Sequence, residues 1–264
     1  MSINGIRLVN EKEYSIFYVD NFSNELKNLI RENLQSICNG FSDVQDDLYS
    51  FFSYQNTLKF FFETYDTKEE SIRKGIIGEL LAHLLIPTYH NNLKSTSILK
   101  NFEENQIKKG FDIVYYDYST SNLWYSESKS GRSGTSVNST IYNKVLLYKS
   151  RAGMLEMFNS GRNKLWDKAR SEVDKTIEIN KGRIDIKNML AKDSPIIAAK
   201  NKKKKVILIS ILYHNLLDEI EPISVKSFQE KTHKKGIFDE TFVLSIQKEA
   251  YESVETFLKS EIIS

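Results

Sequence analysis

Three charged residues near the middle of the chain, Asp112, Glu127 and Lys129, are of types that could act together on one substrate. Carboxylate oxygens are ligands that Mg²⁺ prefers, and a bound metal ion lowers the pKa of its water and neutralises charge that develops on a phosphate. An ammonium group nearby can orient the attacking water or stabilise the transition state. Two carboxylates and a lysine at this spacing therefore suit hydrolysis of a phosphodiester.

The same three charges also fit a plain hairpin with a charged, solvated rim, because Glu-x-Lys after an Asp is a common pattern. Side chains alternate along a strand, so Glu127 and Lys129 share one face. Asp112 shares that face only if the numbers of facing residues have an odd sum, for example 112 opposite 129. An even sum points Asp112 away, and the residues around the loop leave both registers open.

The elements that must position these residues begin with a hairpin over 110–129. Its two runs, Phe-Asp-Ile-Val-Tyr-Tyr-Asp-Tyr and Leu-Trp-Tyr-Ser-Glu-Ser-Lys, are rich in aromatic and β-branched residues and flank Ser-Thr-Ser-Asn. This pattern is typical of a β-hairpin. Gly and Ser residues over 131–134 predict a turn directly after it.

A helix over 67–87 precedes the hairpin, and Pro87 is predicted to end it. Its apolar residues recur at helical spacing and form one broad stripe, with Glu79 at the edge. An edge Glu is usually solvated, but Gly75 and Gly78 flank this turn, and Gly costs about 1 kcal/mol in a helix interior. The two glycines favour close packing of the helix on a sheet. His83 lies one turn later, as a supporting group of the site or an ordinary interface residue.

The remaining elements surround this unit. Apolar residues from Leu26 to Ile37 recur at helical spacing, with Asn21 or Ser23 as a possible cap. Further helices are predicted over 137–158, 163–180, 184–192 and 248–262, and strands over 14–19, 95–102, 206–213 and 242–246. The all-apolar run 206–213 suits a central strand that is reached by a helical crossover. The lysines at 202–205 mark either the solvated start of that strand or a contact with a phosphate backbone.

Composition narrows the class of protein. The chain has 264 residues, a hydrophobic content of 40% and a net charge of +2, which excludes a highly basic nucleic-acid coater but allows a local basic groove. One cysteine rules out a disulfide framework. The N-terminus lacks the apolar core of a signal peptide, and no apolar run reaches 18 residues. We therefore expect a cytoplasmic protein without a membrane contact.

The order helix, strand, strand, strand, helices, strand resembles the restriction-endonuclease-like superfamily and its PD-(D/E)xK motif over roughly 68–213. In that resemblance Asp112 takes the place of the motif Asp, Glu127-Ser128-Lys129 that of (D/E)xK, and Glu79 that of a helix-borne Glu; Gly110-Phe111 stands where the motif Pro would be. The resemblance implies an α/β fold, with a restriction-endonuclease-like core (αβββαβ mixed sheet flanked by helices) and an N-terminal extension. The expected domains are an N-terminal α/β region, 1–66, packed on a nuclease-like domain, 67–264.

A closer resemblance covers most of the chain. The segments 74–83 (Lys-Gly-Ile-Ile-Gly-Glu-Leu-Leu-Ala-His), 110–112 (Gly-Phe-Asp) and 123–131 (Leu-Trp-Tyr-Ser-Glu-Ser-Lys-Ser-Gly) resemble the HamA family, the nuclease subunit of the bacterial Hachiman anti-phage system. The resemblance implies a helicase partner, HamB, and an activity restrained until foreign or damaged DNA is sensed.

Together these patterns predict a metal-dependent DNA nuclease that acts in anti-phage defence. Its Mg²⁺ or Mn²⁺ would be held by Asp112, Glu127 and the Ser128 carbonyl, with Glu79 direct or through water, and Lys129 would complete the catalytic set. No base-reading motif is apparent, so contacts mainly to the DNA backbone and little sequence specificity are expected. The alternatives are a catalytically inactive module that binds DNA or docks a helicase, and an RNase with the same site.

Overall fold

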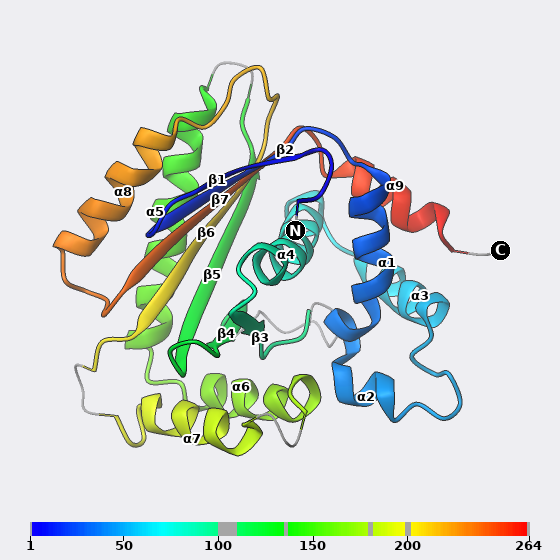
Figure 1. Ribbon diagram of the computed structural model, residues 1–264, viewed down its shortest axis with the longest axis horizontal. Helices are drawn as coiled ribbons and strands as arrows, with labels where there is room; N and C mark the ends of the chain where they lie inside the picture. The colour runs from blue at the N-terminus through cyan, green and yellow to red at the C-terminus, as the bar shows by residue number, and fades with distance from the viewer. Residues whose placement is uncertain (1, 100–109, 135–136, 179–181, 199–201, 263–264) are drawn as a thin grey trace.

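A mixed sheet of seven strands lies at the centre of the computed structural model, counted over the residues that it describes, 2–99, 110–134, 137–178, 182–198 and 202–262 (Figure 1). In spatial order the strands are β1 (Ile6–Asn10), β2 (Tyr14–Val19), β7 (Thr241–Lys248), β6 (Lys205–Tyr213), β5 (Asn122–Arg132), β4 (Ile113–Asp117) and β3 (Leu93–Ser95). Four adjacent strands, β2, β7, β6 and β5, are parallel neighbours, whereas β1, β4 and β3 pair antiparallel. The predicted mixed α/β fold is confirmed.

Strand β6 occupies the middle of the sheet, as its apolar sequence predicts. Its residues from Val206 to Tyr213 are all buried, and parallel partners flank it on both sides. The connection from β5 to β6 runs through α5 (Ser139–Asn159), α6 (Asn163–Thr176) and α7 (Arg183–Asp193), the helical crossover that a parallel pair requires. Within β6 the hydroxyl of Ser210 donates to Asn143 Oδ1, 2.6 Å away on α5.

Helices cover both faces of the sheet. On one face α5 and α8 (Pro222–Lys234) lie side by side against β5, β6 and β7, and α6 and α7 continue this layer. On the other face α4 (Glu70–Tyr89) crosses β5. The helices α1 (Asn24–Asn39), α2 (Phe41–Gln45), α3 (Tyr54–Tyr65) and α9 (Glu252–Ser260) complete the described set. Two cores result, one on each side of the sheet.

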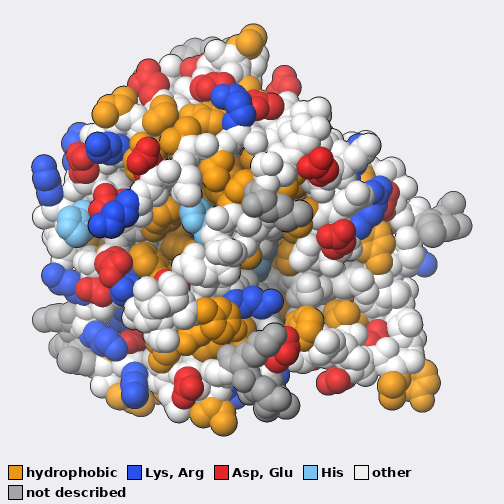
Figure 2. All heavy atoms as spheres, in the orientation of Figure 1, with side chains coloured by type: hydrophobic (Ala, Val, Ile, Leu, Met, Phe, Trp, Pro, Cys, Tyr) orange, Lys and Arg blue, Asp and Glu red, His pale blue; other side chains and the backbone are white. Residues whose placement is uncertain are grey.

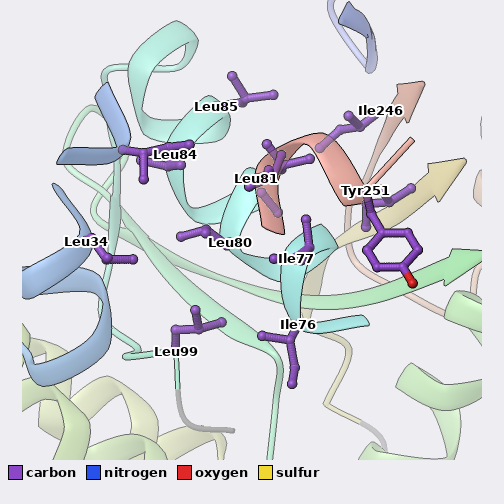
Figure 3. Close-up of a cluster of buried hydrophobic side chains, with 14 of the residues drawn as sticks. Leu34, Ile76, Ile77, Leu80, Leu81, Leu84, Leu85, Leu99, Ile246 and Tyr251 are labelled. Atoms are coloured by element: carbon purple, nitrogen blue, oxygen red, sulfur yellow. The ribbon is translucent and has the colours of Figure 1, made fainter. Parts of the chain in front are cut away.

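Helix α4 is the centre of one core. Every residue from Ile76 to Ile86 is buried, Glu79 and His83 included. Figure 3 shows its leucines and isoleucines converging with Leu34 of α1, Leu99, Ile246 of β7 and Tyr251. Burial all round the helix, rather than along one stripe, is expected of a helix enclosed by a sheet and other helices.

Several sequence predictions need correction. Pro87 lies inside α4, which ends two residues later at Tyr89; a proline in the last turn forfeits one helical hydrogen bond without breaking the element. The strand predicted over 95–102 is Leu93–Ser95, and residues 100–102 lie outside the described part. Gly131 and Arg132, predicted as part of a turn, belong to β5, which continues beside β6. Strand β1 and helices α2 and α8 were not predicted.

The N-terminal region joins the same sheet. Strand β2 pairs with β7 in parallel, and β1 extends the sheet beyond it. Helix α1 starts where the sequence indicates, since the Ser23 hydroxyl accepts a hydrogen bond of 3.2 Å from the Leu26 amide. The division of the chain at 66/67 stays a prediction.

Candidate active site

The hairpin of β4 and β5 opens at one end, and the residues singled out from the sequence lie at this opening. Ile113 pairs with Ser126 in the last register pair of the two strands, after which β5 continues along β6. The register has the odd sum that a shared face requires. If this register continued by one residue, Asp112 would lie opposite Glu127 rather than opposite Lys129. Asp112 itself precedes the first residue of β4.

The Asp112 carboxylate closes the hydrogen-bond ladder. Its Oδ2 accepts from the backbone amide of Ser128 at 2.7 Å and from the Ser128 hydroxyl at 2.8 Å. The Ser128 amide lies beyond the Ile113–Ser126 pair, where β4 has ended and no longer supplies a backbone acceptor. A half-buried amide needs an acceptor. The carboxylate supplies a charge-assisted one, so Asp112 is fixed against β5 at Ser128.

The side chains of Glu127 and Lys129 contact each other beside the Ser128 carbonyl. The Lys129 ammonium donates to Glu127 Oε1 in a short ion pair and to the Ser128 carbonyl at 3.2 Å. Glu127 is 7% exposed, whereas 37% of the Lys129 side chain is open to solvent. The structure therefore brings Asp112, Glu127 and Lys129 together around one backbone residue, Ser128.

Glu79 lies on the opposite side of the sheet from the Glu127 side chain, which faces α5. It lies on α4 and is 3% exposed, so it is not the solvated edge residue that its place in the stripe indicates. Burial, and after it the negative charge of Glu79, raises the pKa of Tyr115 well above the ordinary value of a tyrosine. Tyr115 in turn donates to the Ala82 carbonyl of α4 at 3.4 Å. Glu79 therefore lies near Tyr115 of β4, on the face of the sheet that α4 covers. On the same helix, His83 Nδ1 lies 3.5 Å from Ser95 Oγ.

The glycines of α4 differ in their surroundings. A Cβ added at Gly78 would lie 3.3 Å from Ser130 Cβ and 3.4 Å from Ile211, so the close packing predicted here is confirmed. At Gly75 the nearest atom to an added Cβ would be Ser130 Oγ at 3.9 Å, an ordinary contact. Ser130 therefore faces α4, and by alternation Ser128 does too, while Glu127 and Lys129 face α5.

Helix α5 contributes two residues that the sequence reading missed. The Ser150 hydroxyl donates to the backbone carbonyl of Glu127 at 2.6 Å. Gly153 faces the Glu127 side chain, and a Cβ there would lie 2.7 Å from Oε1. The signal for Gly153 was available, since it is a glycine within a predicted helix, as are Gly75 and Gly78. Nothing in the sequence marks Ser150.

The donor set fits a hard cation. Over the described residues no group of three His, Cys, Asp or Glu side chains is close enough to hold a metal ion by side chains alone. Around Ser128, however, two carboxylates and a backbone carbonyl meet, and the Lys129 ammonium already contacts Glu127 Oε1 and the Ser128 carbonyl oxygen. A positive group thus already lies between these two oxygens. Mg²⁺ commonly takes one or two carboxylates and completes its shell with water and substrate phosphate.

Comparison with known families agrees with the resemblance seen in the sequence. The model of the HamA family matches residues 3–260 of the chain. This chain belongs to the HamA family. Membership fits a role in anti-phage defence. No curated protein matches the chain. The place of this HamA-family chain in the PD-(D/E)xK superfamily stays a prediction.

The lysines at 202–205 are mostly tied to the protein itself in this HamA-family chain. Lys202 forms an ion pair with Asp193, and Lys205 forms one with Glu240. The Lys204 ammonium lies 5.0 Å from the ring centre of Phe158, and burial lowers its pKa. These contacts favour the start of a strand over a phosphate-binding run.

The surface carries both signs of charge. Acidic and basic side chains intermingle with apolar ones over the face shown in Figure 2, in keeping with the net charge of +2. Among the helices in the described ranges, none has the length and apolar character needed to cross a membrane.

Proposed function

We propose that this chain is a metal-dependent DNA nuclease that acts as an effector in anti-phage defence together with a helicase of the HamB type. The observation that carries the proposal is the convergence of Asp112, Glu127 and Lys129 on Ser128 at the open end of the β4–β5 hairpin. A solvated charged rim would not need a carboxylate that is 7% exposed, as Glu127 is, because burying a charge is costly.

The proposed roles follow from the contacts. Asp112, Glu127 and the Ser128 carbonyl would hold Mg²⁺ or Mn²⁺, with Glu79 direct or through water from the α4 side. When bound, the metal would lower the pKa of a water and neutralise charge developing on the phosphate. The Lys129 ammonium, partly open to solvent, can turn from Glu127 to a phosphate oxygen and stabilise the charge that develops there.

The substrate follows from the resemblance to Hachiman nucleases and from the absence of a base-reading motif in the sequence. Contacts mainly to phosphates would give little sequence preference. Incubation of the purified chain, alone and with its helicase partner, with DNA and with RNA tests the proposal. We expect DNA to be cut with Mg²⁺ or Mn²⁺, and Ca²⁺ to bind without turnover. Undiminished cleavage in EDTA would contradict the metal, and cleavage of RNA alone would favour the RNase.

Partner and regulation belong to the same proposal. Uncontrolled cleavage of the cell's own DNA would be lethal, so the nuclease must be restrained, and we propose that the helicase restrains it. Co-expression with the product of the neighbouring gene should give a stable complex that cuts DNA poorly until activated. The absence of a complex, together with full activity of the pair, would overturn this part. An inactive docking module would instead form the complex and leave DNA intact under every condition.

A further inference from the structure

Gly153 stands in the interior of α5, a helix of 21 residues, where glycine is the least favourable residue after proline. Its φ lies outside the left-handed region, so the backbone conformation does not require glycine. What requires it is the neighbour. A methyl group at position 153 would lie 2.7 Å from Glu127 Oε1, 3.2 Å from Cδ and 3.4 Å from Cγ. The space that the missing Cβ leaves is filled by the Glu127 carboxylate.

Ser150, one turn earlier on the same face of α5, holds the backbone of the same residue. Its hydroxyl is fully buried and donates to the Glu127 carbonyl at 2.6 Å. Residues three apart on a helix are neighbours on its surface. Ser150 and Gly153 thus form one seat, in which the hydroxyl fixes the main chain of Glu127 and the glycine admits its side chain.

The carboxylate in this seat is buried and paired with Lys129. Glu127 is 7% exposed, and its Oε1 accepts the short ion pair from Lys129. The carboxylate is nevertheless the far end of a flexible side chain. A Cβ at position 153 would therefore displace the carboxylate and leave the backbone of β5 in place. The predicted effect of filling the seat is a shifted carboxylate in a folded protein.

We infer that Gly153, together with Ser150, is a positioning residue that sets where the Glu127 carboxylate lies relative to Lys129 and the Ser128 carbonyl. The contacts of Ser150 and Gly153 with Glu127 are seen in the structure. Their consequence for metal binding rests on the proposed function. The two parts can be tested separately.

The first test measures thermal unfolding of Gly153→Ala in the wild-type and Glu127→Ala backgrounds. Gly75→Ala is the matched control, because Gly75 faces the same strand from α4 with no close contact. In the control, helix propensity should raise the melting temperature by roughly 2–4 °C. Gly153→Ala should give the same rise when Glu127 is absent and a smaller rise, or a fall, when it is present. Equal rises in both backgrounds would overturn the seat.

The second test titrates Mn²⁺ alone into the same variants, without DNA. Gly153→Ala should weaken Mn²⁺ binding by about 10–100-fold, as loss of a group that orients a ligand does. In the Glu127→Ala background the same substitution should cause no further loss, and Gly75→Ala should bind like wild type. A loss of equal size in the Glu127→Ala background would show that Gly153 acts on the fold and not through Glu127, which overturns the positioning role.

The two results separate the seat from the proposed function. Wild-type protein that binds no Mn²⁺ would defeat the metal-dependent nuclease, while the unfolding data would still decide whether Gly153 accommodates Glu127. If wild-type protein bound Mn²⁺ and Gly153→Ala bound it equally well, the proposed nuclease would stand. Gly153 would then have no positioning role in the metal site.

Discussion

The β4–β5 hairpin has an aspartate at each end, and the two carboxylates are held differently. At the closed end Asp117 is 5% exposed and accepts from four donors through both of its oxygens. The donors are the Ser119 amide at 2.9 Å, the Ser119 hydroxyl at 2.6 Å, the Thr120 hydroxyl at 2.8 Å and the Asn92 amide group at 3.1 Å. At the open end Asp112 is more exposed, and its Oδ2 accepts from Ser128.

The difference separates a structural carboxylate from the one proposed to bind a metal. Burial alone would raise the pKa of Asp117, but the hydrogen bonds from Ser119, Asn92 and Thr120 outweigh it and lower the pKa to about 2. All these donors are neutral. Ser119 and Thr120 close the turn, and Asn92 reaches Asp117 from the residue before β3. Asp112 is hydrogen-bonded to Ser128, whose carbonyl also accepts a hydrogen bond from Lys129. An aspartate that completes a turn and one that is proposed to form a site therefore lie five positions apart in a single hairpin.

The largest effect that would sharpen this comparison is the loss of a carboxylate at the open end. Asp112→Asn and Glu127→Ala should each abolish detectable cleavage, because each removes a proposed metal ligand and hence the activated water. Both variants should stay folded and bind the helicase, since the site lies where the hairpin opens. Cleavage rate and melting temperature should be measured on the same preparations. If either variant cut DNA at the wild-type rate, the charges at the open end would form only a solvated rim.

The next effect concerns the ammonium group. Lys129→Ala should slow cleavage by roughly 10²–10³-fold, by analogy with the loss of one oxyanion donor. The carboxylates and the Ser128 carbonyl remain, so Mn²⁺ should still bind. Single-turnover cleavage at saturating metal is the measurement. A rate restored simply by more metal would show that Lys129 supports metal binding instead of the reaction step.

Much of this hairpin could be predicted from sequence because its information is local. Alternating apolar residues predict the two strands, and the spacing of Glu127 and Lys129 puts them on one face. The position of Asp112 could not be predicted, because it depends on the register, and the loop fits both parities. The register pair Ile113–Ser126 gives the odd sum, and the two hydrogen bonds from Ser128 fix where the carboxylate lies.

Contacts between distant segments account for the rest. Ser150 and Gly153 meet Glu127 only because the chain returns over the sheet as α5, and no local pattern encodes that approach. The burial of Glu79 likewise depends on the packing around α4, which a stripe counted on an isolated helix does not include. The sequence analysis does not single out Asp117 within the first aromatic run of the hairpin, although its short polar neighbours are typical partners of a turn aspartate.

At the closed end the expected effect is on stability alone. Asp117→Asn should lower the free energy of unfolding by roughly 1–3 kcal/mol, because an amide cannot accept all the hydrogen bonds that the carboxylate accepts. Cleavage per folded molecule should equal that of wild type. Urea denaturation and the cleavage assay together check this. If this variant lost activity while keeping its stability, the two ends could not be assigned separate tasks.

The same carboxylate predicts a pH dependence. Its pKa is lowered from the ordinary 3.8 to about 2, so its contribution is fully present above about pH 4 and is lost as the pH falls toward 2. The shift corresponds to roughly 2 kcal/mol at most. The difference in unfolding free energy between wild type and Asp117→Asn should therefore shrink between pH 4 and pH 2. A difference that stays constant over this range would mean that the carboxylate charge contributes nothing.

The smallest effect tests how Asp112 is held. Ser128→Ala removes the hydroxyl donor at 2.8 Å but keeps the amide donor at 2.7 Å and the carbonyl that faces Lys129. We expect a loss of about 0.5–1.5 kcal/mol in stability and a fall in cleavage of less than about tenfold. Ser126→Ala is the matched control, because its hydroxyl donates at 2.7 Å to the Ile113 carbonyl on the same face of β5, outside the site. The control should lose similar stability and no activity. If Ser128→Ala were as inactive as Asp112→Asn, the hydroxyl and not the backbone amide would fix Asp112, and the open end would depend on side chains as fully as the closed end does.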